Sequence, residues 1–265
     1  MNILDKIIQY KKLEIAKQKL DVSVAQLEGK KLFTKEVLSL RQFISDEKKT
    51  GIIAEFKRKS PSKGIINSTA DVAEITAAYT MHGASCLSIL TDEYFFGGTM
   101  QDLVKARVNA IPILRKDFMI DEYQIIEAKA YGADVVLLIA ACLTPAEVQR
   151  LSIFAKNLGL EILLELHTED ELNHICNEVD VIGINNRNLK TFEVNWKHSI
   201  ALANKLPADK LKIAESGIHN IETLLMLKEN GFDGFLIGEN FMKQNNPADA
   251  FRSFVSQLPS SSANV

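Results

Sequence analysis

Residues 133–166, ADVVLLIAACLTPAEVQRLSIFAKNLGLEILLEL, show the pattern from which the fold class can be predicted. The apolar run 135–140 is followed by Thr144-Pro145-Ala146-Glu147, which combines an N-cap, a proline in the first helical turn and a capping-box glutamate. The expected helix ends at Gly159, and a second apolar run covers 162–166. Runs that are apolar almost throughout are typical of strands buried on both faces. We therefore expect a strand, a helix and a second, parallel strand.

The same alternation extends in both directions and produces eight apolar runs. They cover residues 52–56, 86–90, 111–114, 135–140, 162–166, 181–184, 211–214 and 234–237. From Gly83 to Gly231, six units span 148 residues, about 25 each, which fits one strand and one helix joined by tight loops. Eight such units predict an α/β fold, a (β/α)8 TIM barrel over residues 49–265. A doubly wound open sheet is the alternative, although the sequence has no GxGxxG or P-loop motif to support it.

Residues 1–48 have a different pattern and are expected to form an N-terminal helical extension. Ile3, Leu4, Ile7 and Ile8 recur at helical spacing, while Lys6, Lys11 and Lys12 can face water. A second short helix is expected over residues 32–44. Residues 1–50 carry a net charge of +4 and residues 51–265 a net charge of −7. Because no linker-like segment follows residue 50, we expect a single domain over residues 1–265.

The composition excludes several classes of protein. With 46% hydrophobic and 25% charged residues in 265, the chain is typical of a globular protein and not of a disordered one. The net charge of −3 gives no general attraction to nucleic acid or to an anionic membrane. The longest apolar run, residues 135–143, is half of the roughly 18 residues that span a bilayer, and no signal-peptide core is visible. We expect a cytoplasmic protein without nucleic-acid or membrane partners, as a monomer or alternatively a weak homodimer.

Metal sites and disulfides are not expected from the sequence. Its three cysteines lie far apart without a CxxC motif, and its five histidines lack metal-binding spacing. His167 follows a glutamate closely but is interpreted as a surface or packing residue. No metal or organic cofactor is therefore predicted.

Polar residues at the carboxyl ends of the expected strands are the candidates for catalysis, because this end of a TIM barrel holds the active site. Glu55 and Glu165 lie within apolar runs, where an unpaired carboxylate is costly, and Lys57 and Lys116 are the expected partners. Burial and ion pairing shift pKa values and so create acids and bases near neutral pH. Each glutamate taken singly could be structural, but convergence of the whole set favours a catalytic site. The catalytic candidates are Glu55, Lys57, Lys116, Glu165, Asn185 and Glu215.

An anionic substrate is predicted from the segments around these candidates. Small residues in Glu215-Ser216-Gly217 and Ile237-Gly238-Glu239 leave backbone N–H groups open to a phosphate, although tight turns are the alternative reading. The basic segment over residues 57–64 can be interpreted as a solvated run of charges, but an active-site loop for an anionic substrate is at least as well supported, because the segment directly follows the first strand. Six cations are expected to gather at this rim: Lys57, Arg58, Lys59, Lys63, Lys116 and Arg187.

Six of these segments resemble the signature motifs of the indole-3-glycerol phosphate synthase family. They are IAEFKRKSPS at 53–62, LRKDF at 114–118, LEL at 164–166, GINNR at 183–187, AESGI at 214–218 and FLIGE at 235–239. The resemblance covers essentially the whole chain in order, and the motif at 53–62 is the most specific. It implies a carboxy-lyase (decarboxylase) of tryptophan biosynthesis, an aromatic amino-acid pathway. That enzyme converts 1-(2-carboxyphenylamino)-1-deoxyribulose 5-phosphate, a small phosphorylated substrate, into indole-3-glycerol phosphate, CO2 and water without a cofactor.

The resemblance also implies a role for each catalytic candidate. Lys116 would protonate the C2′ carbonyl oxygen of the substrate, and Glu165 would be the base, or its partner, in the dehydration. Lys57, paired with Glu55, would hold the anthranilate carboxylate and act as the acid that removes water. Asn185 and Glu215 would orient the substrate.

Seven further residues are implied in substrate binding. Ser60 would lie near the substrate carboxylate, and Phe96 would line the anthranilate pocket. The phosphate would be held by Arg187, Ser216, Gly217 and Gly238, and Glu239 is the remaining residue implied in substrate binding. Two other readings are kept open: an aldolase that uses Lys116 to form a Schiff base, and a non-catalytic phosphate-binding barrel.

Overall fold

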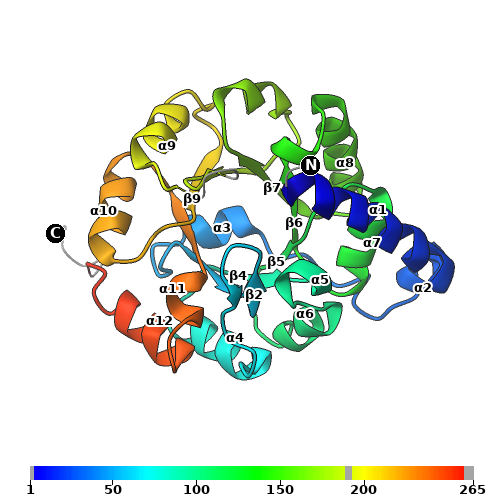
Figure 1. Cartoon of the computed structure of the whole chain (residues 1–265), viewed down its shortest axis with the longest axis horizontal. Helices are drawn as coiled ribbons and strands as arrows, with labels where there is room; N and C mark the ends of the chain where they lie inside the picture. Colours follow the sequence, from blue (N-terminus) through cyan, green and yellow to red (C-terminus); the bar gives the residue numbers. More distant parts are fainter. Residues whose placement is uncertain (1–2, 189–192, 260–265) are drawn as a thin grey trace.

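Eight parallel strands close into a barrel in the computed structural model, which describes residues 3–188 and 193–259 (Figure 1). They are β1 (Ile52–Phe56), β4 (Cys86–Leu90), β5 (Ile113–Lys116), β6 (Val135–Ile139), β7 (Glu161–Leu166), β8 (Val181–Asn185), β9 (Leu211–Glu215) and β10 (Gly234–Ile237). Each strand pairs with its sequence neighbour in the barrel, and β10 pairs with β1 to close it. The prediction of a TIM barrel is confirmed, and the doubly wound sheet is excluded.

Helices form the outer layer and mostly connect consecutive strands. They are α4 (Val72–Met81), α6 (Met100–Ala106), α7 (Glu122–Ala130), α8 (Pro145–Asn157), α9 (Trp196–Ala203), α10 (Ile221–Glu229) and α12 (Pro247–Val255). Shorter elements are α5 (Glu93–Phe96), α11 (Glu239–Met242) and the 3-10 turns η1 (Ala140–Cys142) and η2 (Glu169–His174). The capping box predicted at Thr144 is present at the start of α8. Within residues 3–188 and 193–259, every helix is too short or too polar to cross a membrane.

Strand β5 lies two residues later than the apolar run at 111–114 suggested. The preceding Pro112 has no N–H to donate to a strand ladder, and pairing with β4 begins at Ile113. The strand can then include Arg115 because its guanidinium, buried between barrel and helices, lies 2.7 Å from Glu127 and 3.2 Å from Asp117. Two charged residues in a row therefore end this strand, and the second of them, Lys116, points to the barrel's carboxyl end.

The residues before the barrel form three helices: α1 (Ile3–Asp21), α2 (Val24–Glu28) and α3 (Leu40–Ser45). The prediction of one helix over 32–44 is wrong, because only its last part is helical. The chain before α3 is held in another way, since the N–H of Leu38 donates to the Asp134 carboxylate and Ser39 caps α3. Helix α1 lies across the barrel on the side seen in Figure 1.

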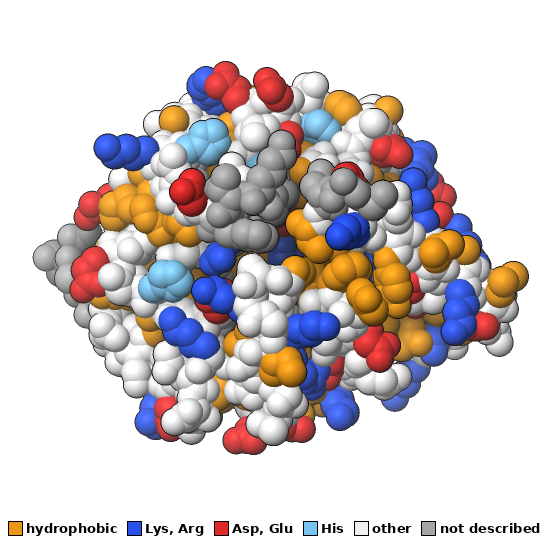
Figure 2. Space-filling model, in the orientation of Figure 1, with side chains coloured by type: hydrophobic (Ala, Val, Ile, Leu, Met, Phe, Trp, Pro, Cys, Tyr) orange, Lys and Arg blue, Asp and Glu red, His pale blue; other side chains and the backbone are white. Residues whose placement is uncertain are grey.

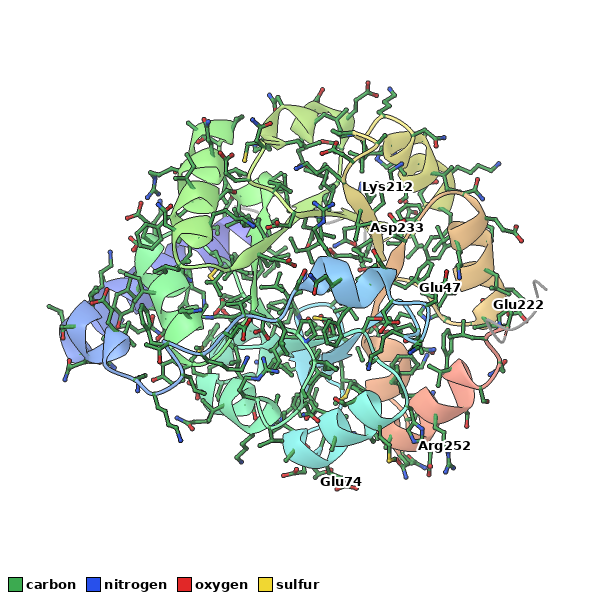
Figure 3. All side chains as sticks on the ribbon, turned by 180° about the vertical axis from the view of Figure 1, so that it is seen from behind. Glu47, Glu74, Lys212, Glu222, Asp233 and Arg252 are labelled. Atoms are coloured by element: carbon green, nitrogen blue, oxygen red, sulfur yellow. The ribbon has the colours of Figure 1, made fainter. Side chains whose placement is uncertain are left out.

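Helix α3 closes the amino-terminal end of the barrel. Its Leu40 and Ile44 join the apolar cluster that fills the interior, together with Ile53 and Ile213. Figure 3, the view from behind, shows α3 over this end. The barrel is therefore a packed core that is open to substrate at the opposite end, where the strands finish.

Candidate active site

A cavity lies at the carboxyl ends of the strands, and all thirteen residues predicted for the site line it. They are Glu55, Lys57, Ser60, Phe96, Lys116, Glu165, Asn185, Arg187, Glu215, Ser216, Gly217, Gly238 and Glu239. The cavity encloses about 1370 Å³, including open solvent at its mouth. Figure 2 shows Lys and Arg side chains gathered around the hollow on this face. Residues from five strands (β1, β5, β7, β8 and β9) and from the segments that follow β1, β4, β8, β9 and β10 thus meet in one place.

Lys116, the last residue of β5, lies between two carboxylates. Its Nζ is 2.7 Å from Oε2 of Glu165 and 3.3 Å from Oε2 of Glu215. On the other side of Glu165, Nδ2 of Asn185 donates to Oε1 at 2.9 Å. The pairing of Lys116 with Glu165 that the sequence predicted is confirmed. Lys116 ends β5 and Glu165 lies near the end of β7, the two strands that flank β6 in the barrel, and both side chains line the cavity.

The electrostatics of this cluster separate its two carboxylates. Burial disfavours the ionised form of Glu165, but Lys116, His167 and Asn185 outweigh burial and hold its pKa well below the usual range. Burial dominates at Glu215 and, with the nearby charge of Glu165, raises its pKa to about 7 against the attraction of Lys116. Glu165 is therefore ionised at neutral pH, whereas Glu215 is partly protonated and can exchange its proton with solvent or substrate.

Lys116 itself is kept protonated. Burial would lower its pKa, but the charges of Glu165, Glu215 and Glu55 raise it above its ordinary value. An ammonium of this kind can donate a proton or a hydrogen bond. It is the opposite of the depressed pKa by which a lysine becomes a nucleophile.

The raised pKa of Glu215 predicts a pH-dependent stability. Its pKa rises from 4.5 to about 7 on folding, so between these pH values the folded state holds a proton that the unfolded state has lost. This group therefore makes the wild type less stable as pH rises from 5 to 8. Glu215→Gln removes the effect, so urea unfolding should show the variant gaining stability relative to wild type over this range. The exposed Glu229→Gln is the matched control, and an unchanged or falling difference for Glu215→Gln would contradict the assignment.

Glu55 and Lys57 form a second ion pair at the end of β1. Nζ of Lys57 is 2.6 Å from Oε1 of Glu55, which confirms the predicted pairing. Gly238 packs directly against this pair. A Cβ atom at Gly238 would lie 2.5 Å from Oε1 and 2.8 Å from Cβ of Glu55, so a larger residue would displace the glutamate. The small size of residue 238 therefore serves the packing of Glu55 as well as the phosphate end that was predicted for it.

The loop after β1 contains a short hairpin, β2 (Lys59–Ser60) and β3 (Gly64–Ile65). Its cations do not all face the cavity. The guanidinium of Arg58 binds the Asp102 carboxylate through two hydrogen bonds of 2.7 and 2.9 Å, and Lys59 donates to the backbone oxygen of Tyr94. The expectation that six cations gather at the rim is therefore wrong for Arg58, which pairs with the buried capping carboxylate of α6, and for Lys59, which is held at the Tyr94 backbone outside the cavity lining.

Another wall of the cavity is formed by a sharp backbone turn after β9. Ser216 and Gly217 follow β9 with φ angles of 68° and 76°, and Nδ2 of Asn186 donates to the backbone oxygens of Glu215 and Ser216. Successive residues in this conformation turn the backbone sharply at the cavity wall. Arg187 lies at the same end, with its guanidinium 3.7 Å from Glu239.

A model of the indole-3-glycerol phosphate synthase family matches residues 4–254. The chain belongs to this family. A member from Bacteroides thetaiotaomicron is 46% identical, and the match covers 97% of this chain and 99% of that protein. A second member, from Bordetella pertussis, is 44% identical over 93% of this chain and 96% of its own length. The tryptophan synthase alpha chain of Legionella pneumophila has a TM-score of 0.59 at 14% identity, covering 82% of this chain and 94% of its own, which shows a shared fold alone.

In this member of the synthase family, helix α1 supplies a wall of the site that the sequence analysis missed. Ile3, Leu4 and Ile7 line the cavity together with Phe118, whose ring centre is 6.0 Å from that of Phe96. The helical spacing of these residues was visible in the sequence, but the direction that the apolar face takes depends on how α1 docks. They give one side of the cavity the apolar character that an aromatic ring requires.

Lys11, which was expected to face water, and His167, which was interpreted as a surface or packing residue, are both buried beside the synthase site. Lys11 is 2% exposed, and its Nζ lies 2.9 Å from Asp92 and from Asp117 and 2.5 Å from Glu14. His167 is 9% exposed, and its Nε2 lies 3.1 Å from Oε1 of Glu165. The expectation was wrong for Lys11 because two of its partners, Asp92 and Asp117, lie on other elements and only the fold brings them together, whereas for His167 the packing alternative is the one that the structure shows.

Proposed function

We propose that the residues of this cavity carry out the ring closure for which the family is named. The chain is an indole-3-glycerol phosphate synthase, a carboxy-lyase of tryptophan biosynthesis, on the strength of the family match over residues 4–254 and relatives of 41–46% identity. The observation that best supports the residue roles is the position of the Lys116 ammonium between an ionised and a proton-sharing carboxylate.

In the first step a carbon–carbon bond forms between the aromatic ring and the C2′ carbonyl carbon. The ring carbon that carries the carboxylate attacks, and Lys116 gives a proton to the carbonyl oxygen, which becomes a hydroxyl group. A donor already aimed at this oxygen stabilises the charge that develops there. Lys57 faces the carboxylate, which leaves as CO2 and returns its bonding electrons to the ring.

In the second step the new hydroxyl group leaves as water and a double bond forms. The departing oxygen needs a proton, which Lys57 supplies. A proton must also be removed from the neighbouring carbon of the newly formed five-membered ring. Glu165 is suited to remove that proton because it is ionised at neutral pH. Its hydrogen bond from Asn185 fixes its orientation, and Glu215 completes the polar wall.

Substrate binding divides between two ends of the cavity. Ser60 and Phe96 belong to the anthranilate end, beside Lys57 and the apolar wall from α1. The phosphate end comprises Arg187, Ser216, Gly217, Gly238 and Glu239. A substrate with a carboxylate at one end and a phosphate at the other matches this separation of cations.

The raised pKa of Lys116 separates this function from a Schiff-base aldolase. An imine forms only from an unprotonated amine, and the surrounding carboxylates oppose loss of the proton. Borohydride added with substrate should therefore trap no covalent adduct, whereas an aldolase would be inactivated by it.

The function is tested by mixing the protein with 1-(2-carboxyphenylamino)-1-deoxyribulose 5-phosphate and recording indole fluorescence together with release of CO2. Both products should appear in equal amounts without added metal or cofactor. Absence of indole-3-glycerol phosphate at every pH between 6 and 9 would overturn the proposal. A non-catalytic phosphate-binding barrel would bind the substrate but leave it unchanged.

We also propose that the extension (1–48) and the barrel (49–265) form one domain. The ion pairs of Lys11 with Asp92 and Asp117 and the hydrogen bonds from Tyr123 to the backbone of Gln18 and Val22 support this. A single unfolding transition followed by two probes is the expected result. The cytoplasmic location and the monomeric state, with a weak homodimer as the alternative, stay predictions from the sequence.

A further inference from the structure

His167 lies directly behind Glu165 and outside the lining of the substrate cavity. Its position is fixed by its own backbone: the N–H donates to Oε2 of Glu171 at 2.5 Å, and Nε2 of His198 lies 2.9 Å from the backbone oxygen. The imidazole is thereby directed at Glu165, with Nε2 3.1 Å from Oε1. Helix α9 and turn η2 thus hold a buried imidazole against the carboxylate assigned as the base.

The two oxygens of Glu165 have different partners, and this difference matters when substrate is present. Oε2 contacts Lys116, whereas Oε1 contacts Asn185 and His167. To protonate the substrate carbonyl, the Lys116 ammonium must turn away from Glu165. The carboxylate then loses its principal cation in a buried site, where an unpaired charge is costly. Asn185 can donate a hydrogen bond but cannot supply a charge.

We propose that His167 is a positioning residue that keeps Glu165 ionised and oriented while Lys116 serves the substrate. This inference rests on the proposed function, because it assumes that Lys116 and Glu165 act on one substrate. His167 itself touches neither the substrate nor the reacting atoms. It acts through the Oε1 atom of Glu165. The carboxylate thereby keeps the His167 imidazolium as a charged partner throughout the reaction.

The surroundings of His167 favour its charged form. The titratable groups that face it or its partner are Glu165, Glu171, Glu215, Lys116, His198 and Cys142. Nδ1 lies 3.9 Å from the Glu171 carboxylate, so the ring is placed between two acidic side chains. Burial would lower the pKa of His167, but Glu165 and Glu171 outweigh burial and raise it above 6.5. The imidazolium is therefore populated around neutral pH.

The test is the pH profile of kcat for His167→Leu and His167→Gln. The imidazolium is the form of His167 that stabilises ionised Glu165, so its loss should cost most at low pH, where His167 is protonated, and least at high pH, where it is neutral; a coupling of one pKa unit between two groups corresponds to a factor of ten. We expect His167→Leu to lower kcat about tenfold at pH 6 and by less than threefold at pH 8.5, with KM changed less than twofold. His167→Gln places an amide donor near the former Nε2 and should recover part of the loss.

The matched control is His174→Gln. Both ring nitrogens of His174 contact backbone oxygens, of Glu171 and Leu143, and not Glu165. Its pH profile should coincide with that of the wild type. If His167→Leu loses the same factor at every pH, or if His167→Gln recovers nothing, the role is merely structural and the inference is wrong. An inactive wild type would instead overturn the proposed function.

A measurement without turnover tests the same contact. NMR titration of the ring Cε1–H of His167 should give a pKa above 6.5 in the wild type, and Glu165→Gln should lower it because the nearest negative charge is gone. An unchanged pKa for His167 in Glu165→Gln would show that the two side chains are not coupled and would overturn the inference.

Discussion

Lys116→Met is expected to lower kcat by about 10²–10⁴, the range that a positioned general acid contributes. The variant keeps the length and apolar stem of the lysine but has no proton to give to the C2′ oxygen. It also leaves Glu165 and Glu215 without their shared cation, so Glu215 should bind a proton more readily. Steady-state indole fluorescence at saturating substrate measures the effect.

The control for this variant is Lys212→Met. Lys212 belongs to β9 but lies at the far end of the barrel, near Asp233 (Figure 3). We expect kcat of this control to stay within twofold of the wild type. A Lys116→Met enzyme that retains a third or more of the wild-type kcat would remove Lys116 from the mechanism.

Lys11→Met is expected to destabilise the protein by about 3–5 kcal/mol, as is typical when one partner of a buried ion cluster is removed. The variant leaves Asp92, Asp117 and Glu14 around an apolar side chain. Burial alone would raise the pKa of Asp117, but Lys11 and Arg115 together lower it to about 2. Its stabilising contribution is thus present in the wild type above pH 4 and is lost as pH falls toward 2.

Urea unfolding at pH 7.5 and pH 5 measures this effect. The deficit of Lys11→Met should be smaller at pH 5, because carboxylates without a cation take up protons more easily. Lys17→Met, an exposed lysine of the same helix, should stay within about 0.5 kcal/mol of the wild type. If the two variants are equally stable, the cluster around Lys11 contributes nothing to folding.

The barrel could be predicted because its signals are local. Strand, capping box and glycine recur within each unit of about 25 residues, and the structure repeats that order. The end of β5 could not be located in this way, because Arg115 has the pattern of a polar interruption until Glu127, on the next helix, supplies a partner. Strand bounds that depend on a contact between two elements cannot be predicted from a short stretch of sequence.

The candidate site could be predicted from the sequence only in part, for the same reason. Glu55, Lys116 and Glu165 were found because a carboxylate or ammonium at a strand end must meet others around the barrel rim. Lys11 was missed because nothing near it in sequence distinguishes a buried charge from a solvated one. His167 was seen to follow Glu165, but its contacts with Glu171 and His198, which place its ring against that carboxylate, were not visible in the sequence. Lys11 finds Asp117 more than a hundred residues away, and only the docking of α1 makes that pair.

The placement of α1 also has a practical consequence for work with this protein. Ile3 and Leu4 are part of the cavity wall, so any peptide fused before them begins beside the bound substrate. An affinity tag at the amino terminus would sit over the entrance and compete for the apolar wall. The carboxyl-terminal helix α12 belongs to the outer layer, and a tag attached beyond it leaves the entrance clear (Figure 1).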